Sequence, residues 1–168
     1  MAKSTFSGPV KSLGGFISAG VNNSVSLTAD TTLTVDAHAG KILLCNDADG
    51  KFTLPSIVTT TPSDPTDPNQ SNNIGASFFF YIETLATDLD IKTDGTDKYV
   101  GTIMVAVDDG AKKSFVPGAT NDVIDMNNGT KGGKVGSYIE ITALATAEYM
   151  VQGVLIGSGS VATPFADA

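Results

Sequence analysis

The chain has 168 residues, of which 41% are hydrophobic and 17% are charged, and its net charge is −8. The hydrophobic content is sufficient for a folded core, and the length suits one domain, or one domain with an arm. All ten basic residues are Lys and none is Arg, so binding to nucleic acid or to anionic membranes is disfavoured.

Residues 1–20 differ from the rest of the chain. Their apolar residues are spaced irregularly among Gly, Ser and Pro, which fits neither the helical nor the strand period. Two interpretations stay open. The segment lies as a strap on its own domain, or it is an extended arm that docks on a neighbouring subunit. The contact residues of such an arm are Phe6, Pro9, Val10, Leu13 and Phe16.

Residues 21–168 are expected to form a single β domain, because Thr, Gly and Val are frequent and good helix formers are scarce. Short apolar or alternating segments, each closed by a Gly, Asp, Asn or Pro turn, predict about ten strands. The predicted fold is all-β, a compact sandwich or barrel of short antiparallel strands with an extended N-terminal arm. The strands are expected at 32–37, 41–45, 51–54, 77–83, 88–92, 99–107, 113–116, 122–126, 137–142 and 148–156.

The first three predicted strands are expected to form a meander. The continuous apolar run at 41–45 predicts a strand that is buried on both faces and carries Cys45 as an unreactive thiol. The Pro-rich segment 59–73 that follows is expected to be a solvated loop, since Pro interrupts both helices and central strands.

The segment 77–83 is the most hydrophobic predicted strand. Alternation places Phe78, Phe80 and Ile82 on one face, and Phe79 and Tyr81 on the other. Aromatic residues on both faces predict either a central strand or one covered by a subunit interface that includes Phe79 and Tyr81.

The sequence offers little for catalysis, and we expect no catalytic or cofactor-binding residues. Cys45 is the only cysteine, so an intrachain disulfide is impossible. His38 is the only histidine and follows the predicted strand 32–37, where a turn position is expected. One Cys and one His cannot form a zinc site, and no nucleophile motif is present. We therefore predict that the protein is not an enzyme.

Asp-rich turns at 46–50 and 94–95 raise the question of calcium. Neither turn fits an EF-hand loop, because ligand positions fall on Cys45 and Ser56 in one alignment and on Lys92 in the other. Hairpin turns account for both, so no metal is expected. An irregular calcium site is an open alternative, built from Asp88, Asp90 or Asp108 and Asp109.

Segments near both ends of the chain carry a resemblance to a known family. These segments are 4–16, the strand pair 32–37 with 41–46, and the segments 52–55, 136–141, 149–155 and 162–165. Over nearly its full length the chain resembles the capsid decoration proteins of tailed bacteriophages, also called cement or head-stabilising proteins. The resemblance implies a β-rich homotrimer on the outer surface of the virion head. It also implies that the major capsid protein is the partner and that neighbouring capsid subunits are clamped together.

This resemblance fits the other expectations for the chain. The first residues lack the apolar run of a secretory signal, and no stretch is long enough for a membrane helix, so synthesis in a host cytoplasm is expected. No nucleic acid, membrane, cofactor or small-molecule substrate is expected as a partner.

Two alternative functions stay open. The chain is a different virion component, such as a head fibre or tail protein, or it is a carbohydrate-binding module for the host surface. The second alternative relies on Tyr99 and Tyr138 as exposed aromatic residues.

Overall fold

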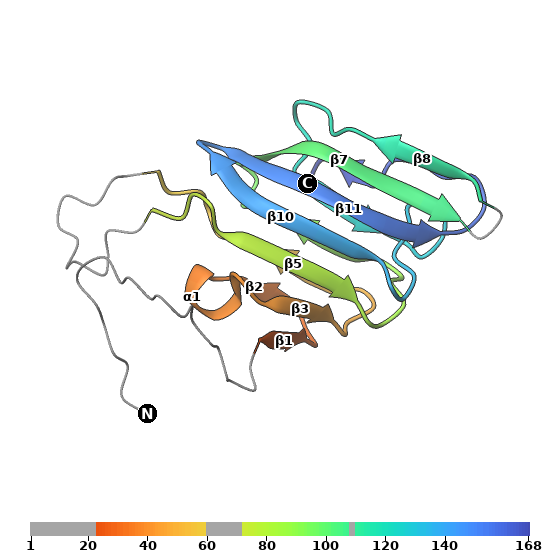
Figure 1. The fold of residues 1–168 in the computed structure, drawn as a ribbon, viewed down its shortest axis with the longest axis horizontal. Coiled ribbons are helices and arrows are strands. Elements are labelled where there is room, and N and C mark those ends of the chain that lie inside the picture. Colours follow the sequence, from red (N-terminus) through yellow and green to blue (C-terminus); the bar gives the residue numbers. More distant parts are fainter. Residues whose placement is uncertain (1–22, 60–71, 108–109) are drawn as a thin grey trace, which may run out of the picture.

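The computed structural model describes residues 23–59, 72–107 and 110–168. These residues form twelve strands and one short helix, arranged as two mixed sheets that pack face to face (Figure 1). The prediction of an all-β sandwich is confirmed. The predicted arm contacts Phe6, Pro9, Val10, Leu13 and Phe16 all lie outside the described residues.

The sheets differ in size. The large sheet has seven strands, in the order β1 (Ser24–Leu27), β3 (Ile42–Cys45), β5 (Ser77–Ile82), β10 (Tyr138–Ala145), β11 (Glu148–Gly157), β7 (Lys98–Val107) and β8 (Lys112–Phe115). The small sheet has five strands, in the order β12 (Phe165–Ala166), β9 (Val123–Met126), β6 (Leu89–Lys92), β4 (Lys51–Thr53) and β2 (Thr31–Thr32).

The first half of the chain coils through both sheets. Strands β1, β3 and β5 are parallel neighbours in the large sheet, and β2, β4 and β6 are parallel neighbours in the small sheet. The corners of this coil stack on one another, because Asn46 N donates to Leu27 O (2.8 Å) and Thr84 N donates to Cys45 O (3.0 Å). The predicted meander is therefore wrong, since β3 and β4 belong to different sheets.

Antiparallel pairing of the predicted kind occurs in the second half. β10 pairs with β11 and with β5, and β7 pairs with β8. β7 and β11, however, run parallel along their ten paired residues. The expected turns at 46–50 and 94–95 are corners between the sheets rather than hairpins, because β3 and β4, and likewise β6 and β7, lie in different sheets.

The prediction of a strand at 32–37 is wrong. Only Thr31–Thr32 forms a strand, and Val35–His38 is a single helical turn, α1. Thr34 caps this turn by accepting a hydrogen bond from Ala37 N (3.3 Å), and the His38 ring accepts one from Thr34 N (2.9 Å). N-terminal capping by Thr is a common start of a helix. It outweighs the alternation of Leu33, Val35 and Ala37, of which only Leu33 is buried.

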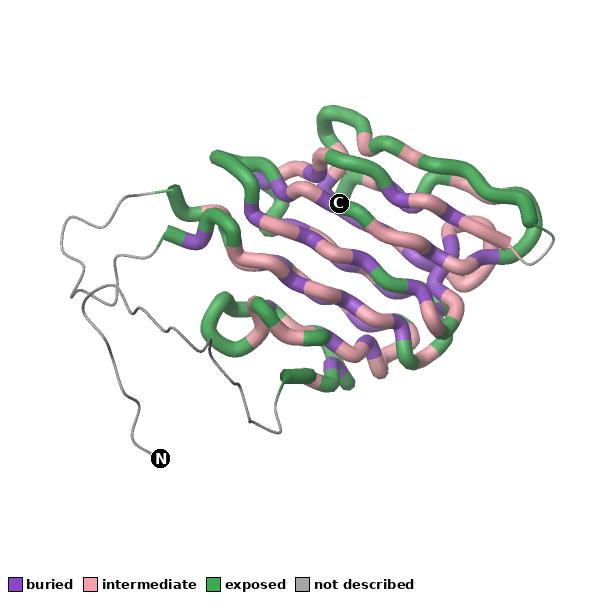
Figure 2. The backbone as a smooth tube through the Cα atoms, viewed as in Figure 1, coloured by how far each residue is buried: buried purple, intermediate pink, exposed green. Residues whose placement is uncertain are grey.

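One hydrophobic core fills the space between the sheets (Figure 2). The rings of Phe52 in β4 and Phe80 in β5 stack across the two layers, with centroids 6.5 Å apart. Strand β3 contributes Leu43 and Cys45 to this core, whereas Ile42 is 44% exposed. The prediction that 41–45 is buried on both faces is therefore wrong.

Candidate functional site

The outer face of the large sheet is the side that points away from the small sheet, and Figure 1 looks directly onto it. Strand register aligns outward-facing side chains across this face, with apolar or aromatic residues at the centre and Ser at each edge. We call this line the transverse row. From edge to edge it consists of Ser26, Leu44, Tyr81, Tyr138, Val154, Met104 and Ser114.

An aromatic pair links Tyr138 of the transverse row to Phe79 beside it. The rings of Phe79 and Tyr138 stack with centroids 6.0 Å apart and an interplanar angle of 18°. Ile42 is paired with Phe79 in the register of β3 and β5. Tyr138 is 41% exposed and Ile42 44%, although apolar residues on the outside of a sheet normally give way to polar ones. This part of the face therefore offers an apolar contact surface.

Polar side chains continue from the aromatic pair toward β7. Gln152 Nε2 donates to Glu140 Oε2 (2.9 Å), and Ser77 Oγ donates to the other oxygen of Glu140 (3.2 Å). Tyr138, Val154 and Gly153 border a shallow hollow together with this Glu–Gln pair. The hollow places hydrogen-bonding groups beside an exposed ring.

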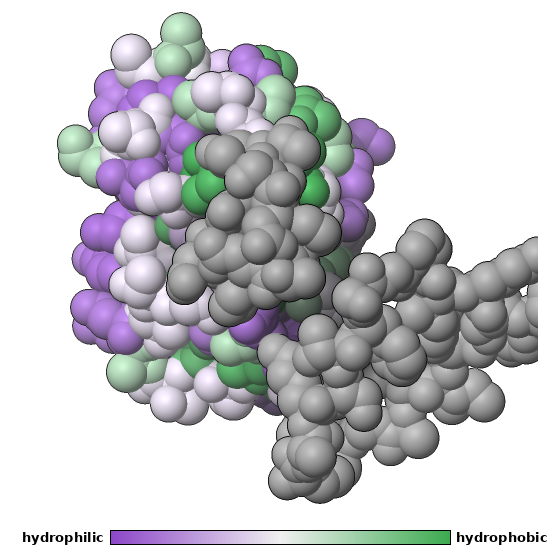
Figure 3. Space-filling model, turned by 90° about the vertical axis from the view of Figure 1, so that its left-hand side faces the viewer, coloured by the Kyte–Doolittle hydropathy of each residue, from purple (hydrophilic) through white to green (hydrophobic). Residues whose placement is uncertain are grey.

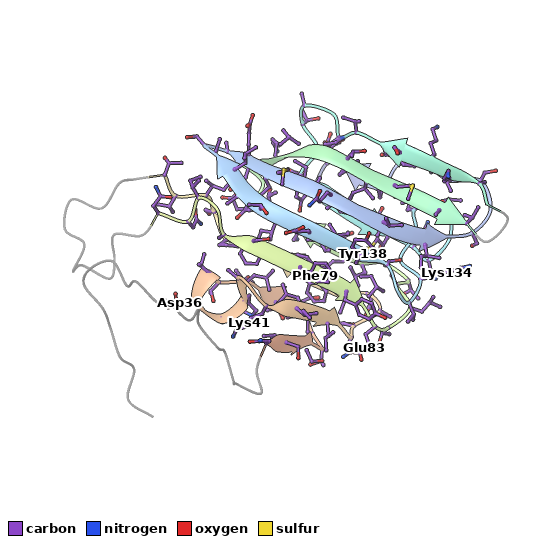
Figure 4. All side chains as sticks on the ribbon, in the orientation of Figure 1. Asp36, Lys41, Phe79, Glu83, Lys134 and Tyr138 are labelled. Carbon is purple, nitrogen blue, oxygen red and sulfur yellow. The ribbon has the colours of Figure 1, made fainter. Side chains whose placement is uncertain are left out.

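Several charged residues lie at the two ends of the face, whereas Glu140 of β10 lies near its centre beside Tyr138. Figure 4 shows Asp36 and Lys41 near one end of the strands, and Glu83 and Lys134 near the other, with the stacked rings between them. A largely apolar patch that includes a few hydrogen-bonded polar groups and has a charged periphery is typical of protein contact surfaces.

The sequence-predicted interface residues Phe79 and Tyr81 both lie on this face and are half-buried. The structure adds Tyr138, Ile42 and Leu44 to them. The sequence contains a signal for this set only at 41–45, where Ile42 and Leu44 alternate with the buried Leu43 and Cys45. In 137–142 the outward positions are Tyr138, Glu140 and Thr142, which are not an apolar series. Which strands are neighbours cannot be known without the topology. An interface at Phe79 and Tyr81 stays a prediction.

The prediction that Tyr99 is an exposed aromatic residue is wrong. It is 2% exposed and its hydroxyl donates to Ile91 O (3.0 Å). Its position on β7 faces the core, where its ring lies near that of Phe165, with centroids 6.4 Å apart. Tyr99 cannot serve as a surface platform, which leaves Tyr138 for that role.

Where the structure describes them, the thiol and the Asp carboxylates considered above for chemistry or metal binding are accounted for by burial or by ion pairs. Cys45 is buried, as predicted, and its burial raises the pKa of the thiol. Asp88 and Asp90 both form ion pairs with Lys51, at 3.0 and 2.9 Å. Among the described residues, no group of three or more His, Cys, Asp or Glu side chains could hold a metal ion. Asp108 and Asp109 lie outside those residues.

A second hollow lies at the end of the molecule where residues 58 and 72 approach each other. Its described lining includes Leu33, Val35, Pro55 and Val58, with Asp36 as the one titratable side chain. Figure 3 views this end and shows hydrophobic residues scattered among hydrophilic ones. The base of the hollow is fixed by Asn73, which accepts a hydrogen bond from Val58 N (2.7 Å). It contains no pair of groups arranged for acid–base chemistry among its described residues.

Comparisons of the chain with protein-family models, curated proteins and solved structures found no match. Within the described ranges, no helix is long and apolar enough to span a membrane. The outer face of the large sheet is therefore characterised by its strand register, exposure and side-chain contacts alone.

Proposed function

We propose that this protein is a non-enzymatic virion component, a decoration protein that binds the outer surface of a phage head and stabilises contacts between major capsid subunits. The observation that carries the proposal is the outer face of the large sheet, on which Tyr138 and Ile42 are exposed beside the stacked Phe79 ring. The resemblance of the sequence to decoration proteins supports the same function.

The chemistry of the face supports binding to protein rather than to nucleic acid. Its centre is largely apolar and carries the acidic Glu140, and the chain has a net charge of −8 without any Arg. Both features oppose contact with phosphate groups. Many weakly bound copies on one capsid act together through multivalency. A single copy therefore does not need a large contact area.

Two parts of the chain have separate roles in this proposal. Phe79 and Tyr81 lie at contacts between subunits of the proposed homotrimer, and residues 1–20 dock on the major capsid protein. The described chain begins at Asn23, directly before β1 at the edge of the large sheet. The proposed arm therefore joins the domain at this edge of the large sheet.

Electron microscopy of virions with and without this protein tests the location. Loss of surface protrusions from capsids that still assemble is the expected result. Loss of the tail would instead assign the protein to a tail structure, and intact capsids that fail only in adsorption would indicate a receptor-binding role. Either of these two outcomes overturns the proposal.

Variants separate the two roles. Deletion of residues 1–16 is expected to leave a folded trimer that no longer binds capsids in co-sedimentation. Tyr81→Ser is expected to weaken the trimer, as measured by light scattering. Val116→Ser is a matched control, because Val116 is 73% exposed and follows β8, away from the aromatic pair. Unchanged capsid binding after the deletion would show that the arm is not the docking element.

A second candidate function, carbohydrate binding, is favoured by one observation. The exposed Tyr138 ring lies beside the Glu140–Gln152 pair in the shallow hollow, and sugars stack on aromatic rings while bonding to such polar groups. Titration with host-surface glycans tests this function. Binding that is lost in Tyr138→Ala and kept in Tyr81→Phe would favour the carbohydrate-binding module over the decoration protein.

A further inference from the structure

Among the described residues, strand β1 is an edge of the large sheet with no further strand beside it. Asn23 O and Leu27 O accept hydrogen bonds from Ile42 N and Asn46 N on the β3 side, both at 2.8 Å. In a parallel pair, alternate residues of a strand bond to the same neighbour. The backbone N–H and C=O groups of Ser24 and Ser26 therefore point away from β3, toward the open side.

The other edges in the described part of the chain are protected, whereas β1 is not. The edges of the small sheet, β2 and β12, are two residues long. The opposite edge of the large sheet, β8, carries the exposed Lys112 and Lys113. Short edges and lysines are common devices against strand addition. β1 has neither charge nor proline, and no charged residue occurs between 12 and 29.

The charge distribution favours β1 of a second copy of this chain as the strand that pairs with β1. Pairing β1 with β1 brings no like charges together, whereas pairing β8 with β8 would place lysines opposite lysines. The side-chain pattern agrees with this choice. Leu27 is 2% exposed and faces the core, while Ser24 and Ser26 lie on the outer face, so a second β1 continues both faces of the sheet.

We propose that β1 of one copy pairs antiparallel with β1 of a second copy, about a two-fold axis that passes through Val25. In this register Ser24 lies opposite the partner's Ser26, and the two residues exchange both backbone N–H···O bonds. Val25 lies opposite the partner's Val25 in a pair without hydrogen bonds. A shift by one residue would join the outer face of one copy to the core face of the other.

The pairing is inferred from β1 alone, and its biological role rests on the proposed function. Four-residue strands bind weakly in solution. On a capsid, two-fold pairing at β1 links subunits of neighbouring trimers, so that decoration proteins stabilise the shell through one another as well as through the capsid protein. Effective concentration on the lattice compensates for the small contact.

Disulfide trapping in the purified full-length protein tests the pairing without any capsid. Opposed residues in a pair without hydrogen bonds have Cα atoms about 4.5 Å apart, inside the roughly 4.4–6.8 Å span of disulfides. Val25→Cys is therefore expected to give covalent dimers under mild oxidation. The native Cys45 is buried and does not compete.

Ser24→Cys is the matched control. Ser24 is more exposed than Val25, so random collisions would crosslink it faster, whereas the proposed register separates the two Ser24 residues beyond disulfide range. A mixture of Ser24→Cys and Ser26→Cys proteins is expected to form the mixed dimer instead, which also tests the register if Val25→Cys folds poorly.

Three results would overturn the proposal. They are faster crosslinking of Ser24→Cys than of Val25→Cys, absence of the mixed Ser24–Ser26 dimer, and crosslinking of Val25→Cys only to the major capsid protein in virions. The last result would assign the edge to a different occupant while leaving the decoration function intact. Failure of capsid binding alone would leave the pairing standing.

Discussion

Tyr99 and Tyr149 lie side by side on the parallel strands β7 and β11, and their hydroxyl groups tie the large sheet to the opposite layer. Tyr99 donates to Ile91 O in β6 (3.0 Å), and Tyr149 donates to Pro55 O just after β4 (2.5 Å). Both rings are buried. The burial raises the pKa of each phenol, so both remain donors at neutral pH.

Removal of either hydroxyl is expected to destabilise the protein. Tyr99→Phe and Tyr149→Phe each lose a buried hydrogen bond, and we expect each to lower the free energy of unfolding by about 1–2 kcal/mol in urea denaturation. Tyr138→Phe is the control, because Tyr138 is 41% exposed, and its change should stay within about 0.5 kcal/mol. Equal effects at all three positions would contradict this role of the buried hydroxyls.

Gly101 is expected to tolerate no side chain. Its φ is 117°, and an added Cβ would overlap the carbonyl oxygen of Val151 in the neighbouring strand β11. Overlap with backbone adds to the strain of the positive φ, so Gly101→Ala should cost about 3 kcal/mol or more. Gly40→Ala isolates the strain, since Gly40 has a φ of 70° and nothing within 4 Å of the added Cβ. Its cost should be about 1 kcal/mol.

Asp122 makes stability depend on pH in the acidic range. Its carboxylate pairs with Lys98 Nζ (2.7 Å) and accepts a hydrogen bond from Ala168 N (2.8 Å). Burial alone would raise the pKa of Asp122, but these contacts lower it below its ordinary value of 3.8. The carboxylate therefore stabilises the fold above about pH 4, and this contribution is lost as the pH falls through the lowered pKa.

The corresponding variant is Asp122→Asn. We expect it to lower the free energy of unfolding by about 2 kcal/mol at pH 7, with a smaller difference from the parent at pH 3. Asp88→Asn is the control, because the Asp88 side chain is 70% exposed in its ion pair with Lys51. Its effect should be below about 1 kcal/mol at both pH values. A constant deficit for Asp122→Asn between pH 7 and pH 3 would count against the ion pair.

Cys45 should react only after unfolding. Its side chain is inaccessible, and burial raises the pKa of the thiol, so the nucleophilic thiolate is scarce in the native state. We expect the rate of labelling by an aromatic disulfide reagent at pH 8 to follow urea unfolding. Fast labelling of the native protein would show that the β3 corner opens readily.

Side-chain alternation and short apolar runs, bounded by turn residues, were sufficient to predict nine of the strands. In β5, for example, Phe78, Phe80 and Ile82 are all buried, while Phe79 and Tyr81 are not. The same alternation failed at 32–37, where Leu33, Val35 and Ala37 fit a strand equally well. Capping of α1 by Thr34 is a local interaction that periodicity does not register.

Strand neighbours could not be predicted in the same way. Asp–Gly turns indicate a change of direction but not the sheet in which the next strand lies. The sequence therefore predicts hairpins at 46–50 and 94–95, where the chain forms corners between the sheets. This matters for the candidate site, because Tyr138 and Phe79 meet only through the pairing of β10 with β5. The prediction that Tyr99 is exposed was wrong for a related reason. Its ring faces inward because its hydroxyl donates to the backbone carbonyl of Ile91 in the opposite sheet.

The passage of the chain from sheet to sheet has a consequence for folding kinetics. From β1 to β7 each strand lies in the other sheet from the one before it, so neither layer is formed by a continuous stretch of sequence. Neither sheet can therefore form completely before the other, and pairings between segments that are distant in sequence must form early. Domains of this kind fold slowly and cooperatively. A nascent chain should thus stay unfolded until β11 and β12 have been synthesised.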